Sequence, residues 1–533
     1  MAAPVADLSP PKPGTRLLAV TTLTGGSLAA TCITPSIQSV RSDPQHATAA
    51  ARRSINWLAT EPSLVGEKRM TEADGTTVRF TVDRSSLDRV EPTDDDGNGR
   101  PDVVDAAAQG IARAQRWLVG QLELPNPGPI EIVLARLGSG VEGFSGVASA
   151  RTSGNRLWLD PAAHGGLAGM RRAAEHQYAH LVASLAGLDP AWGESLAAWT
   201  TLSLEGAPDG TTLAAINRRL AASGAGLIVD DLELATGNAA FLAYLEQADG
   251  ASAVKVAVDE MGKGGSASGA LDRAVRRVAG QSLDEALRDF QLWSLLTGVR
   301  DDHRHFSFAS RLQGPAFAAT ADDLPALSVQ ADPEVAPLGS AAILIHSADR
   351  SGGLDVRFEG DVTGRWGADL LLVRNDGTMH RVPLPVDADQ SAEITVPLQG
   401  VLETLLLVRN LDGEGKPAHR YTWGAHVESR YPVEIADLHV EAAGSSGARV
   451  SWQTDSESGL LGFNVFRSLD DDGSSVRVNP VWIPAVGREG APAAYSFLDP
   501  GATPGVSYRY RIEAVTPEGL TSRSDAVALS PAP

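Results

Sequence analysis

The stretch AEHQYAHLVA (residues 174–183) contains two histidines four residues apart, with a glutamine directly after the first. With glutamate in place of that glutamine, it would read H-E-x-x-H, the helix motif of zinc proteases. The surrounding composition predicts a helix, which Gly187 and Pro190 would end. On a helix, His176 and His180 lie about 40° apart around the axis and about 6 Å along it, so both imidazoles could reach one metal ion.

A third metal ligand is expected on the segment that follows. DPAWGESLAAWTTLSLEG (residues 189–206) predicts a second helix with Glu194 near its start. Two histidines and a carboxylate, with one position left for water, form the ligand set of a catalytic zinc site. With 11 histidines in 533 residues, the bare spacing of His176 and His180 is a weak signal, and the surroundings must support it.

An acidic loop, DDDGNGRPDVVD (residues 94–105), is the clearest cation-binding signal in the chain. Its alternating oxygens suit calcium, which takes about six to eight of them, and Gly99 falls where a twelve-residue calcium loop needs a sharp turn. The expected calcium ligands at loop positions 1, 3, 5, 7, 9 and 12 are Asp94, Asp96, Asn98, the carbonyl of Arg100, Asp102 and Asp105. The alternative is a solvated acidic turn that caps the following helix.

The chain is too long for one hydrophobic core, since single cores stop growing beyond roughly 250–300 residues. We expect a targeting segment and linker at 1–40, an α+β domain at 41–320, a β-sandwich at 325–430 and a second sandwich at 433–531. Strand patterns at 77–82, 129–137 and 155–161, a helix at 102–122 and an almost entirely helical 170–300 predict the α+β domain. Alternating runs separated by Gly, Asp and Pro turns predict the sandwiches.

The N-terminal segment resembles a signal peptide. Lys12 and Arg16 precede LLAVTTLTGGSLAATC (residues 17–32), an apolar run too short for a stable membrane helix. Its end suggests a lipoprotein signal with Cys32, the single cysteine of the chain, as the lipidated residue. We therefore expect a protein that is secreted or held at the cell envelope, with a lipid anchor as one possibility; a disordered N-terminus is the alternative.

Charge and hydropathy limit the partners. The formal charge of −21 argues against nucleic acid, which requires basic patches. After the N-terminal segment no apolar run is long enough to span a membrane. The expected partner is a peptide or protein, as substrate or ligand, while the sequence leaves the substrate and the oligomeric state open.

The last hundred residues resemble a fibronectin type III module. ARVSWQT places Trp452 on an early strand, LGFNVFRS follows, and YSFLDPGATPGVSYRYRIEAVTPEG carries Tyr508 and Tyr510 where that family has its late-strand tyrosines. The resemblance implies a spacer or adhesion unit, because this fold has no activity by itself.

Taken in order, the loop, the histidine helix and the two sandwiches resemble a family of secreted bacterial proteins regarded as zinc metalloproteases, with a zincin-like domain. The similarity in order and spacing extends from about residue 55 to 530. It implies that His176, His180 and Glu194 are zinc ligands. It also implies that Trp192 and Trp199 are the aromatic residues flanking the third ligand.

The chain departs from that family at Gln177, where the family has its catalytic glutamate. That glutamate takes a proton from the zinc-bound water and passes it to the leaving amine, and glutamine has no basic oxygen at neutral pH. Glu175 is a poor substitute, because it points about 200° around the helix from position 177. A second departure is near Thr236 and Gly237, where relatives tend to carry a Tyr-Gly pair whose tyrosine could stabilise an oxyanion.

Three readings follow. The chain is an exported zincin-like protein with weakened or lost peptidase activity, an active metallopeptidase that uses another base, or a non-catalytic surface protein in which the sandwiches serve as binding or structural modules.

Three other histidines are weaker candidates for metal ligands. His303 and His305 fit a solvated charged turn better than a metal site, and His164 could approach the centre only from a loop.

Overall fold

The computed structural model describes residues 31–32 and 68–529, with gaps at 138–140, 147–154, 163–164, 332–333, 348–351, 399, 429–434, 445–446, 455–456, 458–459, 470–474, 488–490, 516–520 and 525. The described chain falls into two units. The helical unit covers the described residues up to Ala316, with Val335–Ser340 and Leu411–Ala418. The β unit contains the remainder. Two short segments from the predicted first sandwich thus group with the helical unit.

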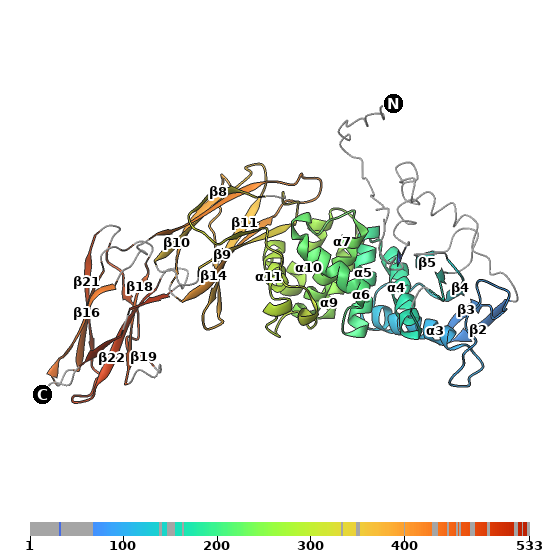
Figure 1. Cartoon of the computed structure of the whole chain (residues 1–533), viewed down its shortest axis with the longest axis horizontal. Helices are drawn as coiled ribbons and strands as arrows, with labels where there is room; N and C mark the ends of the chain where they lie inside the picture. Colours follow the sequence, from blue (N-terminus) through green and yellow to red (C-terminus); the bar gives the residue numbers. More distant parts are fainter. Residues whose placement is uncertain are drawn as a thin grey trace, which may run out of the picture. The chain divides into compact units, whose positions relative to one another are not determined.

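A mixed sheet opens the helical unit, with the strand order β1-β5-β6-β4-β3-β2 among the described residues (Figure 1). The strands are β1 (Thr31–Cys32), β2 (Arg69–Ala73), β3 (Thr76–Phe80), β4 (Ile130–Leu134), β5 (Val141–Gly146) and β6 (Asn155–Leu159). Strands β3, β4 and β6 are parallel neighbours, whereas β5 runs antiparallel to β6 and β2 antiparallel to β3. The predicted β3, β4 and β6 are confirmed; β5 and its pairing with β1 were not anticipated.

Helices make up the rest of this unit. The predicted helix at 102–122 is confirmed as α3 (Asp102–Gln115), whose continuation η1 (Arg116–Gln121) is a π-helix. The following α-helices are α4 (Leu167–Leu185), α5 (Pro190–Glu205), α6 (Gly210–Ala221), α7 (Leu232–Gly237), α8 (Ala239–Asp249), α9 (Ala251–Gly262), α10 (Ala267–Ala279) and α11 (Leu283–Leu295). Their apolar faces form one core with the sheet. The α+β layout is confirmed, with α3 and η1 between β3 and β4 and the other helices after β6.

Gly110 permits an unusually close approach between α3 and α4. A Cβ atom at this position would lie 2.4 Å from the carbonyl oxygen of Arg171 and 2.8 Å from the Cβ of Ala174. Both distances are below van der Waals contact, so only glycine fits without moving one helix. The approach brings α3 against the helix that carries both histidines of the motif.

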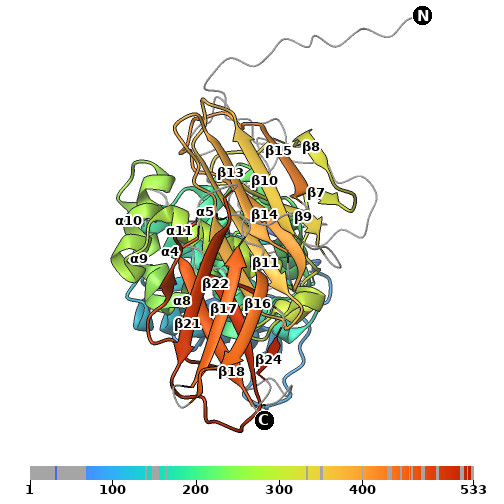
Figure 2. The same cartoon turned by 90° about the vertical axis from the view of Figure 1, so that its left-hand side faces the viewer.

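The first half of the β unit has two sheets, ordered β13-β10-β15-β8 and β12-β11-β14-β9-β7 among the described residues (Figure 2). Their strands are β7 (Ala319–Ala321), β8 (Ala326–Gln330), β9 (Ser340–His346), β10 (Gly353–Gly360), β11 (Trp366–Arg374), β12 (Met379–Pro383), β13 (Ser391–Pro397), β14 (Val401–Asn410) and β15 (Tyr421–Glu428). Phe358 of β10 packs edge-on against Trp366 of β11, with ring centroids 5.8 Å apart. The two sheets therefore face each other in a sandwich-like arrangement.

The second half has two further sheets that share one core. They contain β16 (Ile435–Ala442), β17 (Ala448–Thr454), β18 (Gly462–Ser468), β19 (Val476–Arg477), β20 (Ile483–Pro484), β21 (Ala493–Asp499), β22 (Tyr508–Val515), β23 (Thr521–Arg523) and β24 (Val527–Leu529). Trp452 of β17 contacts Phe463 of β18 at 5.5 Å between centroids, and Tyr510 is fully buried in the same core. The multidomain layout of an α+β region followed by sandwich-like β regions agrees with the expectation.

Within the described residues, none of the helices combines the length and apolarity that a membrane crossing requires. This finding agrees with the expectation that no membrane-spanning helix follows the N-terminal segment.

The close helix contact makes Gly110→Ala destabilising. Alanine normally favours a helix by about 1 kcal/mol over glycine, but here its methyl group overpacks the α3–α4 contact at a cost of about 1–3 kcal/mol. Thermal unfolding followed by helical circular dichroism should show a lower midpoint for the variant. Gly120→Ala is the matched control, because the nearest atom to its added Cβ is 3.9 Å away. Equal midpoints for the two variants would contradict the close approach.

Candidate metal centre

The histidine pair lies on the buried side of α4. The helix starts after Gly166, whose φ of 110° suits glycine alone, and Gly187, with a φ of 79°, lies just past its end. His180 is fully buried, and the His176 side chain is 17% exposed. Their Nε2 atoms are 3.2 Å apart, so the helical spacing turns both imidazoles toward one point.

Glu194 reaches the same point from α5. Asp189 caps this helix by accepting hydrogen bonds from the backbone N–H groups of Ala191 (2.9 Å) and Trp192 (3.0 Å), and Pro190 occupies the first turn. The cap fixes where α5 begins and therefore where the second turn places Glu194. Its carboxylate oxygens lie 3.5 Å from His176 Nε2 and 3.2 Å from His180 Nε2.

The three side chains have the dimensions of a tetrahedral zinc site. Ligand atoms bound at about 2.0–2.1 Å in a tetrahedron lie roughly 3.3–3.4 Å from one another. The two Nε2 atoms are 3.2 Å apart, Oε1 of Glu194 lies 3.5 Å from His176 Nε2, and Oε2 lies 3.2 Å from His180 Nε2, so each of these nearest separations is close to that value. Among the described residues, this group of potential ligands consists of His176, His180 and Glu194. Sequence reasoning chose the same three residues.

The carboxylate of Glu194 is charged although it is buried. Burial by itself would raise the pKa of Glu194, but the facing His176 and then His180 outweigh it and hold the pKa well below its usual value. An ionised carboxylate beside two imidazole nitrogens is a donor set that suits a cation of borderline softness such as Zn²⁺.

Thr236, on α7, contacts the third potential ligand. Its Oγ1 lies 3.1 Å from Oε1 of Glu194 and 2.8 Å from the carbonyl oxygen of Leu232. Sequence reasoning placed this position near the centre only by comparison with relatives that carry a tyrosine. The hydroxyl contact itself had no signal in the sequence.

Gln177 follows His176 on α4 and is 1% exposed. It is a neutral amide at the position where the related motif has its base.

The two tryptophans that flank Glu194, Trp192 and Trp199, are also buried, and Trp199 has a packing role. Its Nε1 donates to Glu246 of α8 at 2.8 Å, and its ring lies 6.2 Å from that of Trp117, so it joins α5 to its neighbours.

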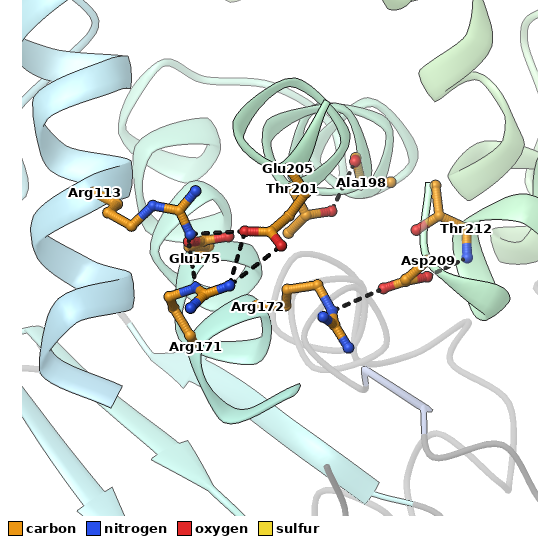
Figure 3. Close-up of polar contacts among 9 residues, drawn as sticks. All are labelled: Arg113, Arg171, Arg172, Glu175, Ala198, Thr201, Glu205, Asp209 and Thr212. Atoms are coloured by element: carbon orange, nitrogen blue, oxygen red, sulfur yellow. Dashed lines mark hydrogen bonds and ion pairs between the residues drawn. The ribbon is translucent and has the colours of Figure 1, made fainter. Parts of the chain in front are cut away.

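Glu175 lies in a cluster of charged side chains with Arg113, Arg171 and Glu205 (Figure 3). Its Oε1 accepts from Arg113 of α3 at 2.6 Å. Arg113 also bonds Glu205 Oε1 at 2.7 Å and the carbonyl oxygen of Leu204 at 3.0 Å, both on α5. Arg171 bonds Glu205 at 3.3 Å from the other side. One guanidinium thus joins the helices α3, α4 and α5.

Burial dominates the ionisation of Glu175, which is fully inaccessible to solvent. Burial raises its pKa to about 7, Arg113 opposes the rise, and Glu205 adds to it. The pKa of the more exposed Glu205 moves the other way: burial would raise it, but hydrogen bonding from Arg113 and the charge of Arg171 lower it.

The calcium-type loop brings together part of its predicted ligand set. Carboxylate oxygens of Asp94, Asp96 and Asp102 all lie within 4.8 Å of one another. Asp105 is engaged elsewhere, because its carboxylate accepts from Arg100 Nε and from Asn98 Nδ2, both at 2.7 Å. For Asp105 to contribute, the Arg100 side chain would have to turn away.

The remaining candidates do not join either group. His303 lies 3.1 Å from Asp301 and is largely exposed, while His305 pairs with Asp302 at 2.8 Å. Both fit the charged turn expected from the sequence. His164 lies outside the described residues, and of Cys32 the structure describes only the backbone, in β1.

Comparisons with known proteins do not extend the sequence resemblance. No family model matches the chain, and no curated protein matches it. Solved structures with similarity include an Fn3-like protein from Clostridium thermocellum, at 18% identity over 19% of this chain and 96% of that one. Another is a β-1,2-glucanase from Parabacteroides distasonis, at 14% identity over 39% of this chain and 32% of that one. Both have a TM-score of 0.14, which supports no inference about function.

The raised pKa of Glu175 predicts that stability falls as pH rises. The folded protein holds this proton up to about pH 7, whereas the unfolded chain releases it near 4.5. The proton on Glu175 makes its full contribution to the free energy of unfolding below about pH 4.5. This contribution, on the order of 3 kcal/mol, is lost as pH rises through about 7. Denaturation of the metal-free protein between pH 5 and 8 should show this decline.

Glu175→Gln should flatten that decline, because its amide carries no titrating proton. Glu205→Gln removes the other carboxylate bound by Arg113, which adds less to the pKa of Glu175 than burial does, and should retain most of the decline. Parallel pH profiles for wild type and Glu175→Gln would contradict the assignment.

Calcium should stabilise the helical unit if the loop binds it. A ligand present at 100 times its Kd raises stability by about 2.7 kcal/mol. Differential scanning calorimetry in millimolar calcium should show a higher Tm than in chelator. Asp96→Asn, which removes one charge from the cluster, should reduce the shift, while Asp209→Asn at the N-cap of α6, outside the cluster, should preserve it. An unmoved transition in millimolar calcium would count against this site.

Proposed function

We propose that the chain is an exported zinc-binding protein of zincin-like, metalloprotease type whose peptidase activity is weakened or lost. The observation that carries the proposal is the convergence of His176, His180 and Glu194, with separations suited to one tetrahedral ion. The signal-like segment before residue 33 makes export, with lipidation of Cys32 as an option, part of the same proposal. Calcium in the loop at 94–105 is its second cofactor, with a structural role.

Three protein ligands leave one position for water or substrate, which is the arrangement of catalytic rather than structural zinc. A zinc ion bound there would supply Lewis acidity, lowering the pKa of a water molecule and polarising a carbonyl group. His176 and His180 contribute neutral imidazole nitrogens, and Glu194 contributes the negative charge that partly neutralises the ion. The partner class follows from this chemistry: a peptide or protein that presents a main-chain carbonyl.

Gln177 is the reason for proposing weak or absent catalysis. Hydrolysis requires a group that takes a proton from water and returns it to the leaving amine, and an amide does neither at neutral pH. Loss of a general base typically costs roughly 10²–10⁴-fold in rate. The engagement of Glu175 with Arg113 counts against its use as a replacement base.

The test combines zinc content with a gain-of-function substitution. The purified chain should bind about one zinc ion per molecule by elemental analysis and cleave a casein or quenched-peptide substrate slowly or not at all. Gln177→Glu should raise cleavage by at least about 10²-fold, since it restores the base beside an intact ligand set.

Two matched variants control this result. Gln177→Asn keeps a neutral amide and should remain inactive. Gln177→Glu combined with His180→Ala should lose both zinc and the gained activity. Rapid cleavage by the unmodified chain would overturn the lost-base proposal, and absence of zinc from a folded protein would overturn the metal site.

A further inference from the structure

The short helix α7 is held firmly against α5. Asp231 caps it by accepting from the N–H groups of Glu233 (2.9 Å) and Leu234 (3.0 Å). Ser195 of α5, the residue after Glu194, has its hydroxyl 2.8 Å from the carbonyl oxygen of Ala235. The residue next to Glu194 thus binds the residue next to Thr236, and the two helices are joined beside the metal centre.

The other side of α7 is equally constrained. A Cβ atom on Gly237 would lie 2.4 Å from the carbonyl oxygen of Ala215 on α6, and equally close to the Cβ of Arg219. Asn238 then donates from Nδ2 to the carbonyl oxygen of Leu227 at 2.8 Å. With contacts on both sides, the backbone at position 236 has little freedom to move.

The hydroxyl of Thr236 has one proton and two acceptors within reach, Glu194 Oε1 at 3.1 Å and the Leu232 carbonyl at 2.8 Å. The Leu232 carbonyl belongs to α7 itself, one turn before Thr236, so that contact stays within the helix. The contact with Glu194 is the one that links the Thr236 hydroxyl of α7 to the carboxylate on α5.

Within the part of the chain that the structure describes, the polar contacts of the Glu194 carboxylate are with His176, His180 and Thr236. The first two are the other potential ligands. Thr236 is the contact that comes from outside the ligand set, and it comes from a rigidly held helix. It can orient the carboxylate without taking part in metal binding itself.

We infer that Thr236 is a positioning residue for the metal centre: its hydroxyl holds the carboxylate of Glu194 in the orientation that completes the site with His176 and His180. The inference rests on the proposed function, because it takes the bound ion to be zinc. Partners of this kind fix the direction of a ligand, and their loss typically costs 10–100-fold in metal affinity.

The experiment measures zinc affinity of the full chain by competition with a chromophoric chelator. Thr236→Val removes the hydroxyl and should raise the zinc Kd by about 10–100-fold. Thr236→Ser retains the hydroxyl and should bind within a few fold of the unmodified chain. Thr236→Ala provides a second hydroxyl deletion if valine disturbs folding.

Thr200→Val is the matched control. Thr200 is buried on α5, and its hydroxyl bonds the carbonyl oxygen of Leu196 at 2.7 Å rather than a ligand. This variant should keep the zinc affinity of the unmodified chain, even if its Tm falls. A purely structural role for Thr236 would lower Tm without changing zinc affinity.

The visible spectrum of the cobalt-substituted protein gives an independent readout of ligand orientation. It should change for Thr236→Val and stay the same for Thr236→Ser and Thr200→Val. Equal zinc affinity for Thr236→Val and the unmodified chain would overturn the positioning role and leave the proposed function standing. Failure of the unmodified chain to bind zinc would overturn both.

Discussion

The arrangement of α3, α4 and α5 depends on the ion pairs and hydrogen bonds by which Arg113 ties these three helices together. Its guanidinium bonds Glu175 on α4, and Glu205 and the Leu204 carbonyl on α5, from its own position on α3. Glu175 is wholly buried. Without Arg113, its carboxylate would lack the opposite charge that offsets the free-energy cost of removing it from water. The tie therefore restricts how far α4 and α5 can separate. Together with the apolar packing of α4 against α5, that restriction sets the distance between the histidines and Glu194.

Adjacent residues on α4 consequently have opposite roles. Glu175 faces the arginine cluster, and His176, one helical step of about 100° further, faces Glu194 and His180. Helix α4 thus carries the ion pair with Arg113 on one face and the candidate cation site on another. The same geometry removes Glu175 from any role at the metal centre, which leaves Gln177 as the residue on which the chemical question depends.

Local patterns in the sequence were sufficient for much of this arrangement. The spacing of His176 and His180, and the position of Glu194 near the start of the next predicted helix, are helix properties that depend on neighbours along the chain. The same holds for β3, β4 and β6, whose apolar runs are bounded by turn residues. Strand β5 carries no such pattern, because VEGFSG (residues 141–146) has two glycines and little apolar alternation.

By itself, the sequence determined the types of most elements, the order of an α+β region before β regions, and the three residues that could bind a metal. Only the tertiary structure decided that the α4 and α5 ligands meet at metal-binding distances, that Thr236 contacts Glu194, and that Asp105 is drawn to Arg100 instead of the aspartate group. The physical reason is separation along the chain. Helix and turn signals act over a few residues, whereas Thr236 lies 42 positions beyond Glu194 and meets it only through packing of α5, α6 and α7.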